Sequence, residues 1–151
     1  STAAQTAIAA GGAGLTIAKL RTAKQTFDLA SVDPSIPRHI VVGPEQITNL
    51  LSTTEVTSSD FNTVKALVQG EIDSFLGFKF TVSNRLAKSG NDRTCIAFAQ
   101  DGITLAIGKD VSARIDERAD KSYATQVYYC QSIGATRMEE AKVLGIVCQE
   151  A

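Results

Sequence analysis

The fold is decided by the stretch Arg38-His39-Ile40-Val41-Val42-Gly43-Pro44-Glu45-Gln46-Ile47-Thr48-Asn49-Leu50-Leu51. Its first half holds Ile40-Val41-Val42, an apolar run short enough for a buried strand. Pro44 and Glu45 then suit the first turn of a helix, because proline needs no amide donor there and a carboxylate complements the helix dipole. The apolar edge within Ile47 to Leu51 continues that helix. The stretch therefore predicts a buried strand followed directly by a helix.

The sequence before this stretch changes character at Gly14. Ser1 to Gly14 is rich in Ala, Gly, Ser and Thr, which predicts a flexible lead-in. Beyond Gly14, apolar residues recur every three or four positions, as in an amphipathic helix, and Thr16 is expected to cap it. The apolar positions are Ile17, Leu20, Ala23, Phe27 and Ala30, while Lys19, Arg21, Lys24 and Asp28 are expected on the other faces.

The sequence after Leu51 predicts a polar loop, one more helix and then strands. Hydroxyl-rich Ser52 to Ser59 is expected to be an exposed loop, and a helix is expected from about Ser59 to Gly70. Beyond Gly70, apolar and polar residues alternate as in half-buried strands. Strands are predicted at 78–82, 94–99, 103–107, 111–115, 123–135 and 143–147. Helices before strands make the expected fold class α+β.

Two features of this strand region set the expected organisation of the chain. Gln100-Asp101-Gly102 is a turn signal, which predicts that 94–99 and 103–107 form a hairpin. The later strands, from Val111 onward, are expected to form a separate antiparallel extension. The chain is therefore divided into a lead-in (1–14), a first domain (15–108) and an extension (109–151).

The composition argues against partners held mainly by charge. Fifteen Lys and Arg residues balance sixteen Asp and Glu residues, so no strong field attracts nucleic acid or an anionic membrane. No apolar run approaches the ~20 residues that cross a bilayer. A cytosolic origin with no membrane partner is expected.

Few side chains are suited to catalysis or to metal binding. Cys95, Cys130 and Cys148 are far apart in strand-like stretches and are expected to be buried, reduced thiols. The only histidine, His39, flanks a predicted strand and is expected to be structural. No catalytic, cofactor or metal site is therefore predicted.

The segment Lys109 to Lys121 mixes four basic with four acidic residues. Such a pattern suits register and partner choice between subunits, and it equally suits a plain solvated strand edge. Both interpretations stay open on physical grounds. The candidate subunit contacts are Arg114, Asp116, Arg118, Asp120 and Lys121, with Thr53 and Glu55 in the predicted loop.

Three stretches resemble the major capsid proteins of tailed bacteriophages: Arg38 to Leu51, Gly70 to Leu86, and Ile107 to Tyr123 continuing through Gly134 to Arg137. The resemblance implies an α+β, Hong Kong 97-like fold. Residues 15–108 would be the axial domain, and 109–151 the C-terminal part of the peripheral domain. It also implies a non-enzymatic virion protein, made in the bacterial cytoplasm, that self-assembles into an icosahedral shell enclosing DNA.

The resemblance also implies partners. These are further copies of the chain in capsomers, with scaffolding and portal proteins, and no cofactor. The family's N-terminal arm, extended loop and spine helix have no counterpart in this sequence, so the chain is expected to stay a monomer or small oligomer and to form no shell. The alternatives are another phage structural or adaptor protein, or a small α+β enzyme with an unrecognised site.

Overall fold

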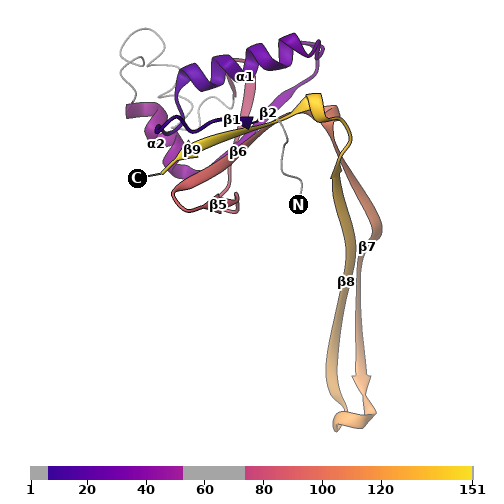
Figure 1. Cartoon of the computed structure of the whole chain (residues 1–151). Coiled ribbons are helices and arrows are strands. Elements are labelled where there is room, and N and C mark those ends of the chain that lie inside the picture. The colour runs from indigo at the N-terminus through magenta and orange to yellow at the C-terminus, as the bar shows by residue number, and fades with distance from the viewer. Residues whose placement is uncertain (1–6, 53–73, 151) are drawn as a thin grey trace. The chain divides into compact units, whose positions relative to one another are not determined.

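The computed structural model describes residues 7–52 and 74–150, which belong to two compact units. Unit 1 comprises the described residues of Ser1–Ile103 and Arg137–Ala151, and unit 2 is Thr104–Thr136. Helices and strands are both present, which confirms the α+β class (Figure 1). The predicted loop at 52–59, with Thr53 and Glu55, and the predicted helix at 59–70 lie outside the described residues, apart from Ser52, which ends the second helix.

Unit 1 is built on a seven-stranded sheet. The strand order is β1 (Ala7–Ile8), β9 (Val143–Gln149), β6 (Asp92–Ala99), β2 (Arg38–Val42), β4 (Phe78–Val82) and β3 (Ser74–Phe75), with β5 (Lys88–Ser89) paired to β6. The pairs β1–β9 and β2–β4 are parallel, and the other pairs are antiparallel. The predicted strands at 78–82, 94–99 and 143–147 are all present in this sheet.

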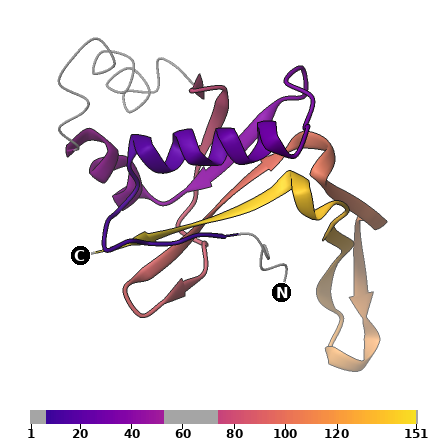
Figure 2. The ribbon, with the colours of Figure 1, turned by 45° about the horizontal axis from the view of Figure 1, so that its top comes forward.

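Helix α1 (Ile17–Leu29) packs against the sheet, as Figure 2 shows. Thr16 caps it as predicted, since its Oγ1 accepts a hydrogen bond from the Lys19 backbone N–H at 3.4 Å. The predicted apolar face is buried from Ile17 to Phe27, and the Phe27 ring lies 6.0 Å from the ring of Phe78 on β4. The prediction is wrong for Ala30, which is exposed as the C-cap residue just after the helix. The prediction is wrong for Lys19, which is buried with this face.

The stretch that was expected to decide the fold forms β2 and then α2 (Pro44–Ser52). Ile40 and Val42 point into the core, and Leu50 of α2 is also fully buried. Strand β2 lies between β4 and β6, so both of its edges are paired. This confirms a buried strand leading directly into a helix.

The expectation of a flexible lead-in is wrong for residues 7–14. Strand β1 pairs with β9, with Ala7 opposite Gly145 and Ile8 opposite Ile146. The Gln149 N–H also donates to the Ala13 carbonyl at 3.1 Å. Small residues at this position let the chain lie against the sheet edge, where backbone groups find partners.

The predicted hairpin between 94–99 and 103–107 is also wrong. Strand β6 pairs instead with β9, from Asp92 opposite Gln149 to Phe98 opposite Val143. After β6 the chain leaves the sheet through the turn η2 (Gln100–Gly102). A Cβ at Gly102 would lie only 2.9 Å from the Lys142 carbonyl oxygen, so only glycine permits this approach.

Composition explains why β6 pairs with β9 and not with β7. Strand β9 is apolar on both faces, as a central strand requires. Strand β7 (Ile103–Arg118) carries charges along its second half and lies outside the large sheet. The expected extension 109–151 therefore loses its last strand to unit 1, and the separate unit is Thr104–Thr136.

Among the described residues, no helix is both long enough and apolar enough to span a bilayer.

Candidate subunit interface

Unit 2 is a two-stranded antiparallel hairpin formed by β7 and β8 (Ala124–Arg137). Strand β7 has 16 residues, a length of roughly 50 Å at ~3.3 Å per residue. The tip consists of η3 (Ala119–Lys121) followed by Ser122 and Tyr123, whose φ angles of 51° and 57° are left-handed. None of the residues Thr104–Thr136 is buried, so the hairpin has no core.

Large apolar side chains on the hairpin are exposed to solvent. Their exposed fractions run from 50% at Tyr128 to 71% at Ile115 and Tyr123. The set is Leu105, Ile107, Val111, Ile115, Tyr123, Val127, Tyr128, Tyr129 and Ile133. An isolated two-stranded hairpin is marginally stable in water, and contiguous exposed apolar surface marks an interaction site. The hairpin is therefore suited to being covered by another surface.

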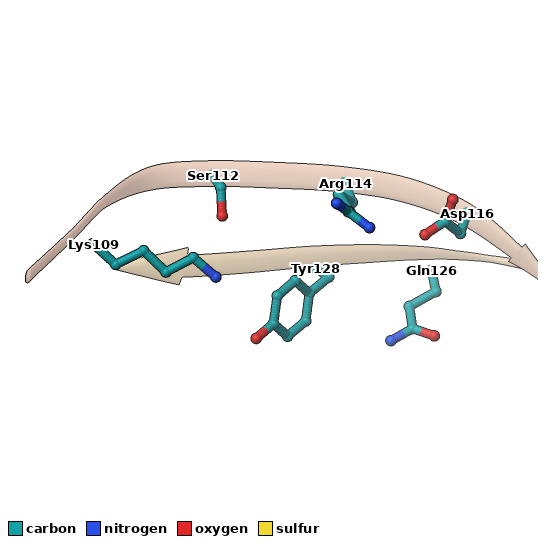
Figure 3. Close-up of a pocket in the computed structure, with 6 residues that line it drawn as sticks. All are labelled: Lys109, Ser112, Arg114, Asp116, Gln126 and Tyr128. Atoms are coloured by element: carbon teal, nitrogen blue, oxygen red, sulfur yellow. The ribbon is translucent and has the colours of Figure 1, made fainter. Parts of the chain in front are cut away.

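The two faces of the hairpin differ in polarity. One face carries an open groove of about 580 Å³, lined by Lys109, Ser112, Arg114, Asp116, Gln126 and Tyr128 (Figure 3). Successive side chains of a strand point to opposite faces. Val111, Ile115 and Val127 therefore lie on the opposite face to Ser112, Arg114 and Gln126. This second face, together with Tyr129, is the apolar face of the hairpin.

The structure separates the predicted contact residues into two groups. Arg118 and Asp120 form a forked ion pair with each other at the tip, with Nε–Oδ1 at 2.8 Å and Nη2–Oδ2 at 2.5 Å. This pair raises the pKa of Arg118 and lowers the pKa of Asp120. Arg118 and Asp120 are thus satisfied within one chain.

Arg114 and Asp116 form the second group. Both are exposed on the groove face, and neither forms an ion pair with any described residue. Figure 3 shows them in succession along β7, with Tyr128 and Gln126 of β8 nearby. Lys121 is exposed at the tip. Arg114 and Asp116 are therefore available to an incoming partner.

Sequence reasoning missed four groove residues: Lys109, Ser112, Gln126 and Tyr128. Lys109 and Ser112 are within the predicted charged segment but were not singled out. Gln126 and Tyr128 could only be placed beside Arg114 once the pairing of β7 with β8 was known. Alternation along each strand gives a side chain's face, but not the residue that stands across from it.

The cysteines and the histidine have structural surroundings in unit 1. Cys95 and Cys148 are buried and reduced, as expected, whereas Cys130 on the hairpin is only half-buried. The neighbouring Cys148 thiol and burial raise the pKa of Cys95, so its reactive thiolate is disfavoured. The His39 ring stacks on Phe98 at 5.5 Å. Over the described ranges, no group of His, Cys, Asp and Glu residues is placed to hold a metal ion.

Solved structures with a similar fold come from phage and related particles. A structure from Mycobacterium phage Che8 has 19% identity and a TM-score of 0.72, covering 95% of this chain and 53% of that chain. The capsid of Ralstonia phage GP4 has 11% identity and a TM-score of 0.69, covering 99% and 51%. A virus-like particle from Pyrococcus furiosus has 16% identity and a TM-score of 0.56, covering 97% and 56%.

These likenesses define the class: the chain has the Hong Kong 97-like fold of phage shell proteins, as its sequence predicted. It spans about half the length of those solved chains. The family described as phage capsid protein matches residues 1–150, and the chain belongs to this family. No similar sequence was found among curated proteins.

Proposed function

We propose that this chain builds a phage shell by associating with further copies of itself. The observation that carries the proposal is the hairpin Thr104–Thr136, which has no buried residue and exposes a row of large apolar side chains. Each Val or Ile side chain that moves fully from water into an interface contributes about 1.5–3 kcal/mol. Such a surface is costly in a free monomer and useful in an assembly.

Under this proposal the two units have different tasks. Unit 1, with its paired sheet and buried core, would serve as the axial domain at the capsomer centre. Unit 2 would belong to the peripheral domain and reach neighbouring subunits. Candidate partners beyond the chain itself are scaffolding and portal proteins. The shell would enclose DNA without sequence-specific contacts, which agrees with a formal net charge of -1.

The proposal includes a purely structural role in the virion capsid, with synthesis in the cytoplasm of the bacterial host. Family membership supports this role. Strongly perturbed acid–base groups often indicate catalysis. In the part of the chain that the structure describes, the carboxylate with the largest such shift, Glu150, is enclosed by cations in unit 1 and has a structural explanation.

Sedimentation velocity at micromolar concentration tests self-association directly. The chain is expected to populate dimers or other small oligomers. A variant with Ile115→Thr, Val127→Thr and Tyr129→Thr removes apolar surface but keeps residues that favour strands, and it is expected to be monomeric. Gln126→Thr on the groove face is the matched control and should associate like the wild type. Association that survives the triple substitution would contradict the proposed surface.

Electron microscopy tests the shell itself. The product of the complete reading frame that encodes this chain is expected to form closed particles, and the 151-residue chain alone is expected to form none. Failure of the complete product to form particles, in the presence of its co-expressed phage partners, would refute the proposed function.

A further inference from the structure

We propose that two copies of this chain join edge to edge through β7, antiparallel, about a two-fold axis at Ile115. The hairpins of the two copies would then form one four-stranded sheet. This inference rests on the proposed function, because it names one strand edge through which self-association would occur. Closed oligomers commonly use two-fold interfaces, in which one surface patch is its own complement.

The outer edge of β7 is open to such pairing. Within the described residues, β7 pairs with β8 alone, so its other edge presents unpaired backbone N–H and C=O groups. An open edge of this kind is a template for a further strand. The regular strand ends at Arg118, where η3 begins.

The charges on β7 favour a second copy as the incoming strand. Arg114 and Asp116 are two residues apart, so they share the groove face, and they form no ion pair with each other. A two-fold axis at Ile115 places Arg114 opposite Asp116 of the second copy, and Asp116 opposite Arg114 of the second copy. Directly opposed residues have Cβ atoms about 4.5–5.5 Å apart, close enough to interact across the strands.

The same charges disfavour neighbouring registers. A two-fold axis at Arg114 would place Arg114 opposite Arg114 of the second copy. An axis at Asp116 would place Asp116 opposite Asp116 of the second copy. Like charges directly opposed are destabilising. A further register, centred on Ser112, would pair Arg114 with Asp110. However, the Asp110 Oδ1 already accepts a hydrogen bond from the Val111 N–H at 2.7 Å.

Other features of the hairpin agree with an axis at Ile115. The ion pair with Arg118 neutralises Asp120, which lies just beyond the paired region. On the apolar face, the two Ile115 side chains would contact each other and cover surface that is 71% exposed in the single chain. Strand β8 has no charged residue from Ala124 to Thr136, so its edge has no charge pattern to select a register.

Charge exchange tests the pairing. Arg114→Asp alone and Asp116→Arg alone each place like charges opposite one another twice, and each is expected to raise the dissociation constant about tenfold. The double variant Arg114→Asp with Asp116→Arg restores two opposite pairs and is expected to return to within about threefold of the wild type. If the double variant associates as weakly as the single variants, the pairing is refuted.

Crosslinking tests the register in a background that carries Cys130→Ser. Ile115→Cys places two thiols directly opposite at the axis, a geometry that allows a disulfide. Two thiols lose two protons and two electrons to an added disulfide oxidant such as oxidised glutathione, and the product is a covalent dimer that reductant reverses. Ser112→Cys and Tyr129→Cys are matched controls and are expected to crosslink at least tenfold less. Equal crosslinking at all three positions, or none at position 115, would overturn the inference.

The outcomes separate this inference from the proposed function. If the chain self-associates but neither charge exchange nor the Ile115→Cys crosslink follows expectation, association uses another surface and the β7 pairing is wrong. If the wild-type chain shows no self-association and the complete product forms no particles, the proposed function itself is wrong.

Discussion

Glu150, at the end of the described chain, is enclosed by the guanidinium of Arg93 on β6, which contacts both of its carboxylate oxygens. Gln46 of α2 donates to the same carboxylate at 3.0 Å, and the Lys88 ammonium lies 2.5 Å away. Glu150 is only 1% exposed. These donors, with Arg93 first, lower the pKa of Glu150 to about 2. The carboxylate therefore ties the C-terminal end of β9 to α2 and β5.

Replacing this carboxylate should change the acid stability of the protein. The folded pKa of Glu150 is depressed from 4.5, so its contribution to stability is present above that unfolded value and is lost as pH falls towards about 2. Glu150→Gln is expected to lower the Tm by several degrees near neutral pH, with a difference from wild type that shrinks in this acid window. Calorimetry across pH measures it. Glu117→Gln, exposed on β7, is the control, and a pH-independent Tm difference for Glu150→Gln would contradict the assignment.

Lys19 has a comparable role beside the same C-terminal end of β9. Its ammonium donates to the carbonyl oxygens of Ala13 at 2.7 Å, Gly14 at 2.8 Å and Val147 at 3.1 Å. One buried cation therefore joins α1, the lead-in and β9. In an apolar variant these carbonyls would lose the ammonium, and Ala13 would keep only its bond from the Gln149 N–H.

Lys19→Met should therefore destabilise the fold. The cost is expected to be about 3 kcal/mol, because hydrogen bonds to a charged group are lost and buried acceptors stay unpaired. Urea unfolding measures the loss, and hydrogen exchange should show faster exchange at the Gln149 amide, which bonds to Ala13. Lys24→Met, on an exposed position of the same helix, is the control and should cost less than about 0.5 kcal/mol. Equal costs for the two variants would show that the three carbonyls do not depend on Lys19.

Local elements could be predicted from the sequence because their causes are local. The 3.6-residue period and the Thr16 hydroxyl define α1, and Pro44 with Glu45 starts α2. Lys19 shows where this logic ends. Its spacing indicates an exposed position, yet its stem is buried because its ammonium reaches a carbonyl 128 residues away in sequence. No helical period contains that information.

The pairing of strands is the other feature that local patterns did not predict. A turn signal at Gln100-Asp101-Gly102 favours a hairpin, but β9 is the more apolar partner for β6 and displaces β7. The candidate subunit contacts also depend on structure that local sequence patterns do not reveal. The mixed charges around Arg114 were visible in the sequence, whereas the pairing of Arg118 with Asp120 depends on the backbone of the tip.

Unit 1 should fold without the hairpin. None of the residues Thr104–Thr136 is buried, and the Met138 N–H donates to the Gly102 carbonyl at 3.0 Å, so a short linker can close the gap. Replacing Thr104–Thr136 by a Gly-Ser linker is expected to change the Tm by no more than about 5 °C and to abolish self-association. Calorimetry and sedimentation measure the two effects, and inserting the same linker after Ser122 is the control. An unfolded product would show that the hairpin stabilises unit 1.

Charge reversal should separate Arg114 from Arg118, although the sequence predicted both as candidate subunit contacts. The Arg118–Asp120 pair is exposed at the tip, where such pairs contribute little to folding. Arg118→Glu is therefore expected to shift the Tm by less than about 2 °C and to change the dissociation constant of the dimer by less than about threefold, since Arg118 faces only Ser112 of the second copy. Arg114→Asp should leave the Tm equally unchanged but weaken association about tenfold, because it opposes two Asp–Asp pairs. Calorimetry and sedimentation on both variants decide the matter. If Arg118→Glu weakened association as much as Arg114→Asp, the tip would be a contact in its own right and the axis could not lie at Ile115.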